Sequence, residues 1–400
     1  MKKLKVLFYG NIFSNSGGTK SFSILKNSQL IDLYFGAPII GSLYQYDISE
    51  DKIIILPTRD CFGPVVDSNI IELTKDIDIV IDVCDGIPYD KPYKSILYHT
   101  NSPIKIMHTA FNSDISRKSP QLNIDAYFSC SLDMMRNFKL YDEFNKNMFC
   151  LYCIQEPIKV TLEKRNEVRK RFNIPEDSFL IGSTCGDDTL NRYVVTEFIK
   201  KYPNVYFLTT SSYGETDRFG CVGIPENFRS IGPVDAKYVE SLLSSFDVLI
   251  HTRTETFGSC VYEALAAGIP VVARWSSSNN GYAECIYPHG GYLCGPGDDD
   301  VFLSAKCCVD ALEHVYKNYN EALDRAKIAK NRVSRWYPEN IVPQYEKLFA
   351  SIALNKGILS LNDLEKYISI KTSPDIKDLL DWSNITRVEI EKKLLNNSFI

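Results

Sequence analysis

The chain has 400 residues, of which 44% are apolar and 24% charged, an ordinary balance for a globular protein of two or three domains. Its formal net charge of −5 lacks the basic excess that a broad surface for nucleic acid or an anionic membrane needs. The twelve cysteines come with no secretion signal, and the longest nearly apolar run, at residues 264–273, is about half of a membrane span. We therefore expect a cytoplasmic protein without a transmembrane segment.

Short apolar runs rich in β-branched residues alternate with longer amphipathic segments along the chain. Such continuous runs predict parallel strands that are buried on both faces of a sheet. Two series of runs, separated by a polar stretch, predict an α/β fold with two doubly wound, Rossmann-like domains. The first series lies at residues 4–9, 53–56, 77–83, 95–98, 104–107, 126–129 and 148–154, and the second at 179–181, 205–209, 248–250 and 270–273.

The polar stretch at residues 155–177 marks the expected domain boundary. We predict an N-terminal domain at 1–156, a second domain at 157–350 and a helical extension at 351–400, where Ser360 and Thr386 look like helix caps. The stretch holds a Lys/Arg cluster made of Lys164, Arg165, Arg169, Lys170 and Arg171. Because two glutamates interleave with these cations, we interpret the cluster as a solvated helix face; peripheral contact with a membrane is the lesser alternative.

Two features of the first part fall at expected ends of strands. Gly17 and Gly18 stand in a Gly-rich turn between the first strand and a helix, where the backbone can approach a phosphate closely. Taken alone, the pair is equally well explained as a turn. His108 closes the run at 104–107, and His99 follows the run before it. We favour His108 as a site residue over His99, although a lone histidine is more often structural.

The segment 247–273 is predicted to form a strand, a loop, a helix, a turn and a second strand. The helix should open at Phe257 or Gly258 and run to Ala267, since Gly268 is a natural C-cap and Pro270 cannot continue a helix. Loops at the carboxyl ends of strands bind ligands in open α/β sheets. Free N–H groups at the helix start, left approachable by Gly258 and Ser259, make an anion site.

Two glutamates frame this predicted anion site. Glu255 stands just before the helix and Glu263 lies inside it, about 12 Å further along by helical rise. That spacing would suit the sugar and ribose ends of a nucleotide sugar. The alternative is one acid that satisfies the helix dipole and a second that is simply solvated.

The whole segment resembles the signature of the retaining GT-B glycosyltransferases of family 4, also called glycosyl transferases group 1. That signature has two glutamates separated by seven residues, with Phe-Gly after the first and Glu-Ala-x-Ala-x-Gly-x-Pro-Val-Val from the second; here it begins at Glu255 and Glu263. The resemblance extends from about residue 169 to 349. It implies a GT-B fold of two Rossmann-like domains with an interdomain cleft.

The resemblance also implies roles for individual residues. Glu263 would bind the ribose hydroxyls and Glu255 the donor sugar, while backbone amides of Phe257, Gly258 and Ser259 would meet the sugar and diphosphate. Gly17 and Gly18 match the family's N-terminal Gly-Gly loop over the diphosphate, and His108 matches a histidine near the anomeric carbon. The family's diphosphate-gripping arginine position is occupied by Asp187, and Arg192 falls near its lysine position.

The resemblance implies a retaining transfer of sugar from a UDP- or GDP-linked donor to a glycan or other hydroxyl acceptor. Asp82, Asp85 and the triplet Asp298 to Asp300 are candidate carboxylates for a metal. No cofactor and no metal are expected, however, since helix termini and cations can replace the metal. Because Asp187 weakens the phosphate grip, a catalytically weakened nucleotide-sugar-binding protein is one alternative. Another enzyme on the same fold, a nucleotide-sugar epimerase or a phosphorylase, is the other.

Overall fold

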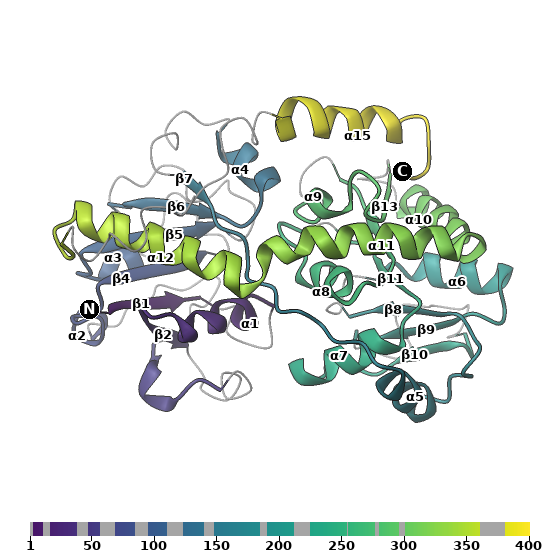
Figure 1. The fold of residues 1–400 in the computed structure, drawn as a ribbon, viewed down its shortest axis with the longest axis horizontal. Helices are drawn as coiled ribbons and strands as arrows, with labels where there is room; N and C mark the ends of the chain where they lie inside the picture. Colours follow the sequence, from purple (N-terminus) through teal and green to yellow (C-terminus); the bar gives the residue numbers. More distant parts are fainter. Residues whose placement is uncertain are drawn as a thin grey trace. The chain divides into compact units, whose positions relative to one another are not determined.

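The computed structural model divides the chain into two compact units, each formed from two stretches of sequence. Unit 1 comprises residues 1–154 and 338–382, and unit 2 comprises 155–337 and 383–400 (Figure 1). This division differs from the expected boundaries, because residues 338–382 pack with unit 1 and the predicted C-terminal extension is shared between the units. The structure describes residues 3–10, 17–37, 47–56, 69–84, 95–109, 123–139, 148–184, 190–211, 225–253, 255–276, 280–295, 301–360 and 381–400.

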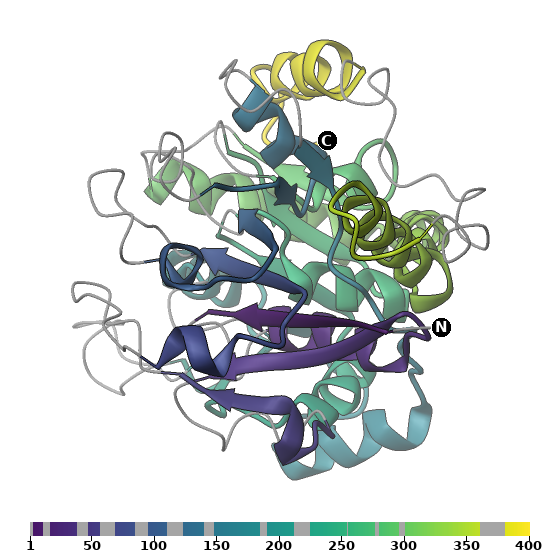
Figure 2. The same cartoon turned by 90° about the vertical axis from the view of Figure 1, so that its left-hand side faces the viewer.

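Unit 1 is built on a seven-stranded parallel sheet, whose strands lie side by side in Figure 2. The sheet order is β3 (Ile53–Ile55), β2 (Ile31–Ala37), β1 (Leu4–Tyr9), β4 (Ile79–Cys84), β5 (Ile104–Thr109), β6 (Ala126–Ser129) and β7 (Met148–Cys150). The described helical elements are α1 (Gly17–Ser23), η1 (Ile24–Asn27), η3 (Glu50–Lys52), α2 (Ile70–Leu73), α3 (Ile96–His99), α4 (Leu132–Lys139) and α12 (Pro338–Asn355).

Alternate residues of these strands supply two apolar layers. On one face Leu7, Val80 and Met107 pack with α2 and α3. On the other face aromatic rings from the strands, α1 and α12 meet: Phe8 stacks on Phe22 at 4.5 Å between ring centroids, and Phe128 stacks on Phe349 of α12 at 5.8 Å. The hydroxyl of Ser28 also donates a hydrogen bond to the Glu346 carboxylate at 2.5 Å. The late helix α12 is therefore an integral layer of unit 1.

Unit 2 is built on a six-stranded parallel sheet. Its order is β10 (Phe228–Ser230), β9 (Tyr206–Thr209), β8 (Leu180–Ser183), β11 (Val248–His251), β12 (Val271–Arg274) and β13 (Tyr292–Cys294). The described helical elements are α5 (Leu162–Arg171), α6 (Arg192–Lys201), α7 (Ala236–Ser245), α8 (Ser259–Ala267), α9 (Ala283–Ile286), α10 (Val301–Lys317), α11 (Tyr319–Val333), η8 (Ser334–Trp336) and α15 (Arg387–Leu394); η9 (Asp381–Thr386) joins the two units.

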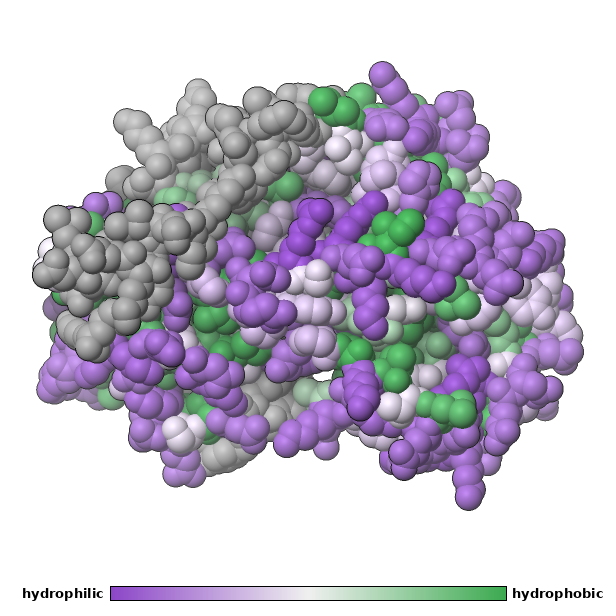
Figure 3. Space-filling model, viewed as in Figure 1, coloured by the Kyte–Doolittle hydropathy of each residue, from purple (hydrophilic) through white to green (hydrophobic). Residues whose placement is uncertain are grey.

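The helices α6 and α10 share one large apolar core with the strands of unit 2, and α7 and α8 pack on β8, β11 and β12. Solvent-facing helices carry charge: on α11, Glu321 pairs with Arg325, and Asp324 with Lys327. Figure 3 shows hydrophilic residues predominating over the drawn face of unit 2, with apolar residues in small scattered groups. Within the described ranges, no helix combines the length and the hydropathy that a membrane crossing requires.

The two doubly wound sheets confirm the predicted fold class, and most predicted strands are present. The predicted strand at 95–98 is wrong, since α3 occupies Ile96–His99 and the Ser95 hydroxyl accepts the Leu97 N–H at 3.1 Å as an N-cap. The solvated face predicted for the Lys/Arg cluster is wrong for Arg169, which is fully buried.

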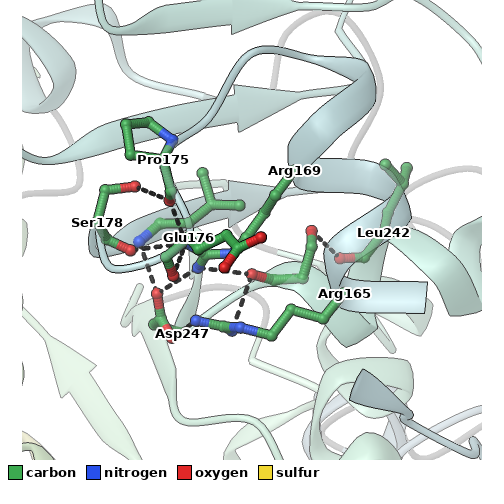
Figure 4. Close-up of polar contacts among 9 residues, drawn as sticks. Arg165, Arg169, Pro175, Glu176, Ser178, Leu242 and Asp247 are labelled. Carbon is green, nitrogen blue, oxygen red and sulfur yellow. Dashed lines mark hydrogen bonds and ion pairs between the residues drawn. The ribbon is translucent and has the colours of Figure 1, made fainter. Parts of the chain in front are cut away.

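Arg169 of α5 anchors the amino-terminal side of the second sheet (Figure 4). Its Nη2 donates to the Asp247 carboxylate at 2.8 Å and its Nη1 to the carbonyl oxygens of Pro175 and Ser178 at 3.0 and 2.8 Å. The same carboxylate accepts the Leu180 N–H at 2.7 Å, at the start of β8. Burial lowers the pKa of Arg169, and the Asp247 charge opposes that shift. The network fixes α5 to the amino-terminal ends of β8 and β11, opposite to the carboxyl ends of these strands.

Candidate functional site

The strand order of unit 2 reverses between β8 and β11. In open α/β sheets such a switch point opens a crevice at the carboxyl ends of the two strands, where ligands bind. The loop after β11 leads through Glu255 into α8, so the segment singled out from sequence emerges at this point. We call residues 252–258 the donor loop; Thr254 within it lies outside the described residues.

Gly258 ends the donor loop and caps α8, which begins at Ser259 and ends at Ala267. Its φ of 81° is left-handed, and a Cβ there would lie 2.7 Å from the Tyr282 ring. Both observations require glycine. The Gly258 carbonyl accepts the N–H groups of Val261 and Tyr262 at 2.9 and 3.2 Å, which starts the helix. The predicted C-cap at Gly268 is confirmed, also with a φ of 81°.

A second segment, at residues 280–282, holds the donor loop in place. The Gly281 N–H donates to the Glu255 carbonyl at 2.9 Å, and the Tyr262 hydroxyl donates to the Gly281 carbonyl at 2.9 Å. Tyr282 is fully buried, and its hydroxyl reaches the carbonyls of Arg253, at 3.2 Å, and Arg274. Burial, and then the charge of Glu255, raise the pKa of the Tyr282 phenol well above its usual value, so it stays a donor.

Sequence reasoning missed this second segment. Gly281 approaches the donor loop so closely that a Cβ would lie 1.9 Å from the Thr256 carbonyl oxygen. Asn280 is fully buried and forms a parallel bridge with Glu255. The Asn-Gly-Tyr sequence at these positions was the available signal, but it indicates only a turn, and contact with a loop 25 residues earlier is a tertiary property.

The two glutamates are not turned out to solvent. Glu263 is 8% exposed within α8, and Glu255 is half-buried. Because Glu255 precedes the first residue of α8, the helical rise used for the 12 Å expectation does not span the two positions. Phe257 is buried and stacks on Tyr262 at 4.0 Å between centroids, so its side chain is structural and only its backbone is offered to a ligand.

Arg192 is the first residue of α6, which follows β8 on the other side of the switch point. The preceding Asn191 caps α6 by accepting the Tyr193 N–H at 3.0 Å. The Asn191 N–H donates to the Thr252 hydroxyl at 2.7 Å, which ties the start of α6 to the donor loop. The structure therefore brings the start of α6 next to the donor loop, while the Arg192 guanidinium carbon lies 5.3 Å from the centroid of the Tyr193 ring. Asp187 lies outside the described residues.

The strand order of unit 1 also reverses, between β1 and β4. Gly10 follows β1 there, and a Cβ on it would lie 2.7 Å from the Val83 carbonyl oxygen, so only glycine fits. Gly17 and Gly18 open α1 beyond residues 11–16, which lie outside the described residues. Gly17 and Gly18 are thus the first two residues of the helix that follows β1, and their place over a diphosphate stays a prediction.

His108 lies near the carboxyl end of β5, on the sheet face covered by α1 and α12. It pairs in register with Phe128, and its ring meets Phe22 edge-on at 5.2 Å. The side chain is 2% exposed, and neither ring nitrogen has a hydrogen-bond partner among the described residues. Burial lowers the pKa of His108 to about 4, so the imidazole is neutral at pH 7. His99 instead ends the short helix α3.

Of the carboxylates considered for a metal, Asp82 lies among the described residues. Asp82 is fully buried and its carboxylate accepts a hydrogen bond from the Ser95 hydroxyl. Asp85 and the triplet Asp298 to Asp300 lie outside the described residues. Within the described ranges, no three histidine, cysteine or acidic side chains group as metal ligands.

Comparisons with known proteins agree with this geometry. Residues 218–332, which include the donor loop and α8, match the family model "Glycosyl transferases group 1". No match is found among the curated proteins.

Three solved structures share the fold of nearly the whole chain. A glycosyltransferase from Rickettsia africae is 14% identical with a TM-score of 0.69, and the match spans 89% of this chain and the whole of that one. Anabaena HepE in complex with UDP-glucose is 15% identical with a TM-score of 0.63, at the same coverage. A protein from Listeria monocytogenes described as a UDP-N-acetylglucosamine 2-epimerase is 13% identical with a TM-score of 0.55, and the match spans 90% of this chain and 98% of that one. The chain therefore has the GT-B fold of these structures, and its residues 218–332 match the family of group 1 glycosyl transferases.

Proposed function

We propose that the protein transfers a sugar, with retention of anomeric configuration, from a UDP- or GDP-linked donor to a glycan or other hydroxyl acceptor. The observation that carries the proposal is the donor loop, which lies at a sheet switch point, is hydrogen-bonded to residues 280–282 and ends at the N-terminus of α8. Glu255 and Glu263 flank that terminus away from open solvent. A complex of Anabaena HepE with UDP-glucose supports a nucleotide-sugar donor on this fold.

The chemistry that we propose needs positioning more than a strong base. The amides at the start of α8 would receive the diphosphate, where the helix dipole favours negative charge. Arg192 would add a cation to the same place. As the bond between the anomeric carbon and the diphosphate breaks, the acceptor oxygen bonds to that carbon on the same face and its proton passes to a diphosphate oxygen, while the protein stabilises the developing charge.

Each remaining site residue has a proposed role. Glu263 would bind the ribose hydroxyls and Glu255 the donor sugar, and the Gly17–Gly18 turn would approach the diphosphate from unit 1. A neutral His108 would serve as a hydrogen-bonding partner beside the reacting carbon rather than as a cationic acid at pH 7. The interdomain cleft stays a prediction, as do the cytoplasmic location and independence of a metal.

A thermal-shift screen against UDP, GDP and ADP sugars tests the donor, because a ligand that binds only the native state raises Tm. Nuclear magnetic resonance of the product then shows whether the anomeric configuration is kept. Glu263→Gln should lose the shift, while Glu321→Gln, in an exposed ion pair on α11, should keep it. Conversion of the donor without an acceptor would favour an epimerase, and binding without turnover would favour the weakened binding protein.

A further inference from the structure

The chain returns to unit 2 after α12, through residues 383–400, which we call the C-terminal segment. Its helix α15 buries Ile390 and Leu394 (Figure 1, yellow). Beyond α15, Ile400 and Leu293 exchange backbone hydrogen bonds at 3.0 and 3.1 Å, so the segment adds an antiparallel partner to β13 at the edge of the sheet. It is therefore built into the unit that carries the donor loop.

Arg387, the first residue of α15, is 5% exposed although it carries a charge. Its guanidinium carbon lies 5.0 Å from the centroid of the Trp275 ring, and its Nη2 lies 3.5 Å from the Ser276 carbonyl oxygen. Its Nε pairs with Glu391 at 3.1 Å. A buried guanidinium is costly to desolvate, so the contacts with Trp275 and Ser276 have to offset that cost.

The partners of Arg387 lead directly to the donor loop. The Ser276 N–H donates to the Asn280 side-chain oxygen at 2.7 Å, and the Asn280 amide donates back to the Ser276 carbonyl at 2.5 Å. Asn280 in turn bridges to Glu255, and the neighbouring Gly281 N–H binds the Glu255 carbonyl. Two residues, Ser276 and Asn280, thus connect the guanidinium with the backbone of Glu255.

We propose that Arg387 is a positioning residue of the donor site. By fixing Trp275 and the Ser276 carbonyl, it holds the hydrogen-bonded pair of Ser276 and Asn280 in place, and that pair sets the backbone of Glu255 against the donor sugar. The role in donor binding rests on the proposed function. The ordering of Ser276 and Asn280 is a property of the chain alone, so the two parts can be tested separately.

The test compares Arg387→Met and Arg387→Lys with Lys393→Met, a matched change on the same helix. Lys393 contacts Glu389 at 2.8 Å and the Tyr287 hydroxyl at 2.7 Å, on the exposed side of α15. Arg387→Met should raise the donor KM about tenfold, the scale of a lost charged hydrogen bond, and leave kcat within about twofold. Arg387→Lys keeps a cation over Trp275 and should recover most of the loss. Lys393→Met should leave KM unchanged.

Hydrogen exchange gives the readout that needs no donor. The amides of Ser276 and Gly281 should exchange faster in Arg387→Met than in the wild type or Lys393→Met. Equal exchange and equal KM in Arg387→Met and Lys393→Met would overturn the inference, whatever the loss of Tm. A wild-type protein that binds no nucleotide sugar would instead refute the proposed function, and the exchange comparison would still decide whether Arg387 orders Ser276 and Asn280. If Arg387→Met does not fold, Arg387→Gln, which also removes the cation over Trp275, carries the same comparison.

Discussion

The close approach of Gly281 to the donor loop makes Gly281→Ala a sharp test of the site. The added Cβ would lie 1.9 Å from the Thr256 carbonyl oxygen and 2.7 Å from the Phe257 Cα, and both are backbone atoms. Ordinary contacts begin at about 3.4 Å, so the two backbones must separate by about 1.5 Å. A forced shift of this kind costs about 1–3 kcal/mol of unfolding free energy.

That cost predicts a small loss of stability and a large loss of activity. For a unit of this size, Tm should fall by roughly 2–12 °C. A displacement of about 1 Å at a binding group can lower kcat/KM on the order of 100-fold. Unfolding followed by circular dichroism gives Tm, and release of nucleoside diphosphate gives kcat/KM.

The control is Gly295→Ala, the same substitution in the same unit. Its Cβ would meet side-chain atoms of Leu394 and Trp275 at 3.4 and 3.5 Å, which are ordinary contacts. If Gly281→Ala keeps kcat/KM within twofold of this control, the backbone at Thr256 and Phe257 does not position the donor. The reasoning that places the donor at this loop would then be refuted.

Three further outcomes are expected. The pKa of His108 is about 4 in the folded protein and 6.5 in the unfolded chain, so the unfolded state binds the proton first and the unfolding free energy falls by about 3 kcal/mol from pH 6.5 to 4. Urea unfolding of His108→Gln should lack this part of the dependence of unfolding free energy on pH, and an unchanged dependence would contradict the burial of a neutral His108. Arg169→Met should cost about 3–5 kcal/mol of unfolding free energy, measured with urea, because it removes one partner of a buried ion pair. The control Lys170→Met, at an exposed position, should cost little, and equal losses would contradict the network of Arg169 and Asp247. Cys260 is half-buried, with its sulfur 3.5 Å from the His251 Nδ1, so mass spectrometry should find it alkylated before the buried cysteines. Bound donor should slow this alkylation, and an unchanged rate would argue against the place of Cys260 in the site.

The fold class could be read from the sequence because parallel strands buried on both faces leave continuous apolar runs. Periodicity could not separate the run at 95–98 from a strand, since four residues are too few and the cap made by Ser95 decides for a helix. The strand Ile31–Ala37 was missed because Asp32 and Tyr34 interrupt the run, although both lie at half-buried positions.

The candidate site was only partly readable, for a related reason. The donor loop and α8 are continuous in sequence, so one motif located them together. The groups that hold the loop come from elsewhere, in Asn280, Gly281 and Tyr282, and no local pattern records that contact. Arg169 was misread because charge composition cannot show that Asp247 and several carbonyls surround it.

The membership of α12 in unit 1 has a consequence for biosynthesis. Its rings at Tyr345 and Phe349 cover aromatic residues that are made some 200 or more residues earlier, such as Phe22 and Phe128. At translation speeds of about 5–20 residues per second, the intervening stretch 155–337 takes roughly 10–40 s to make. During that interval the nascent first sheet presents an uncovered aromatic face. The yield of native protein should therefore depend on chaperones that shield this face until α12 leaves the ribosome.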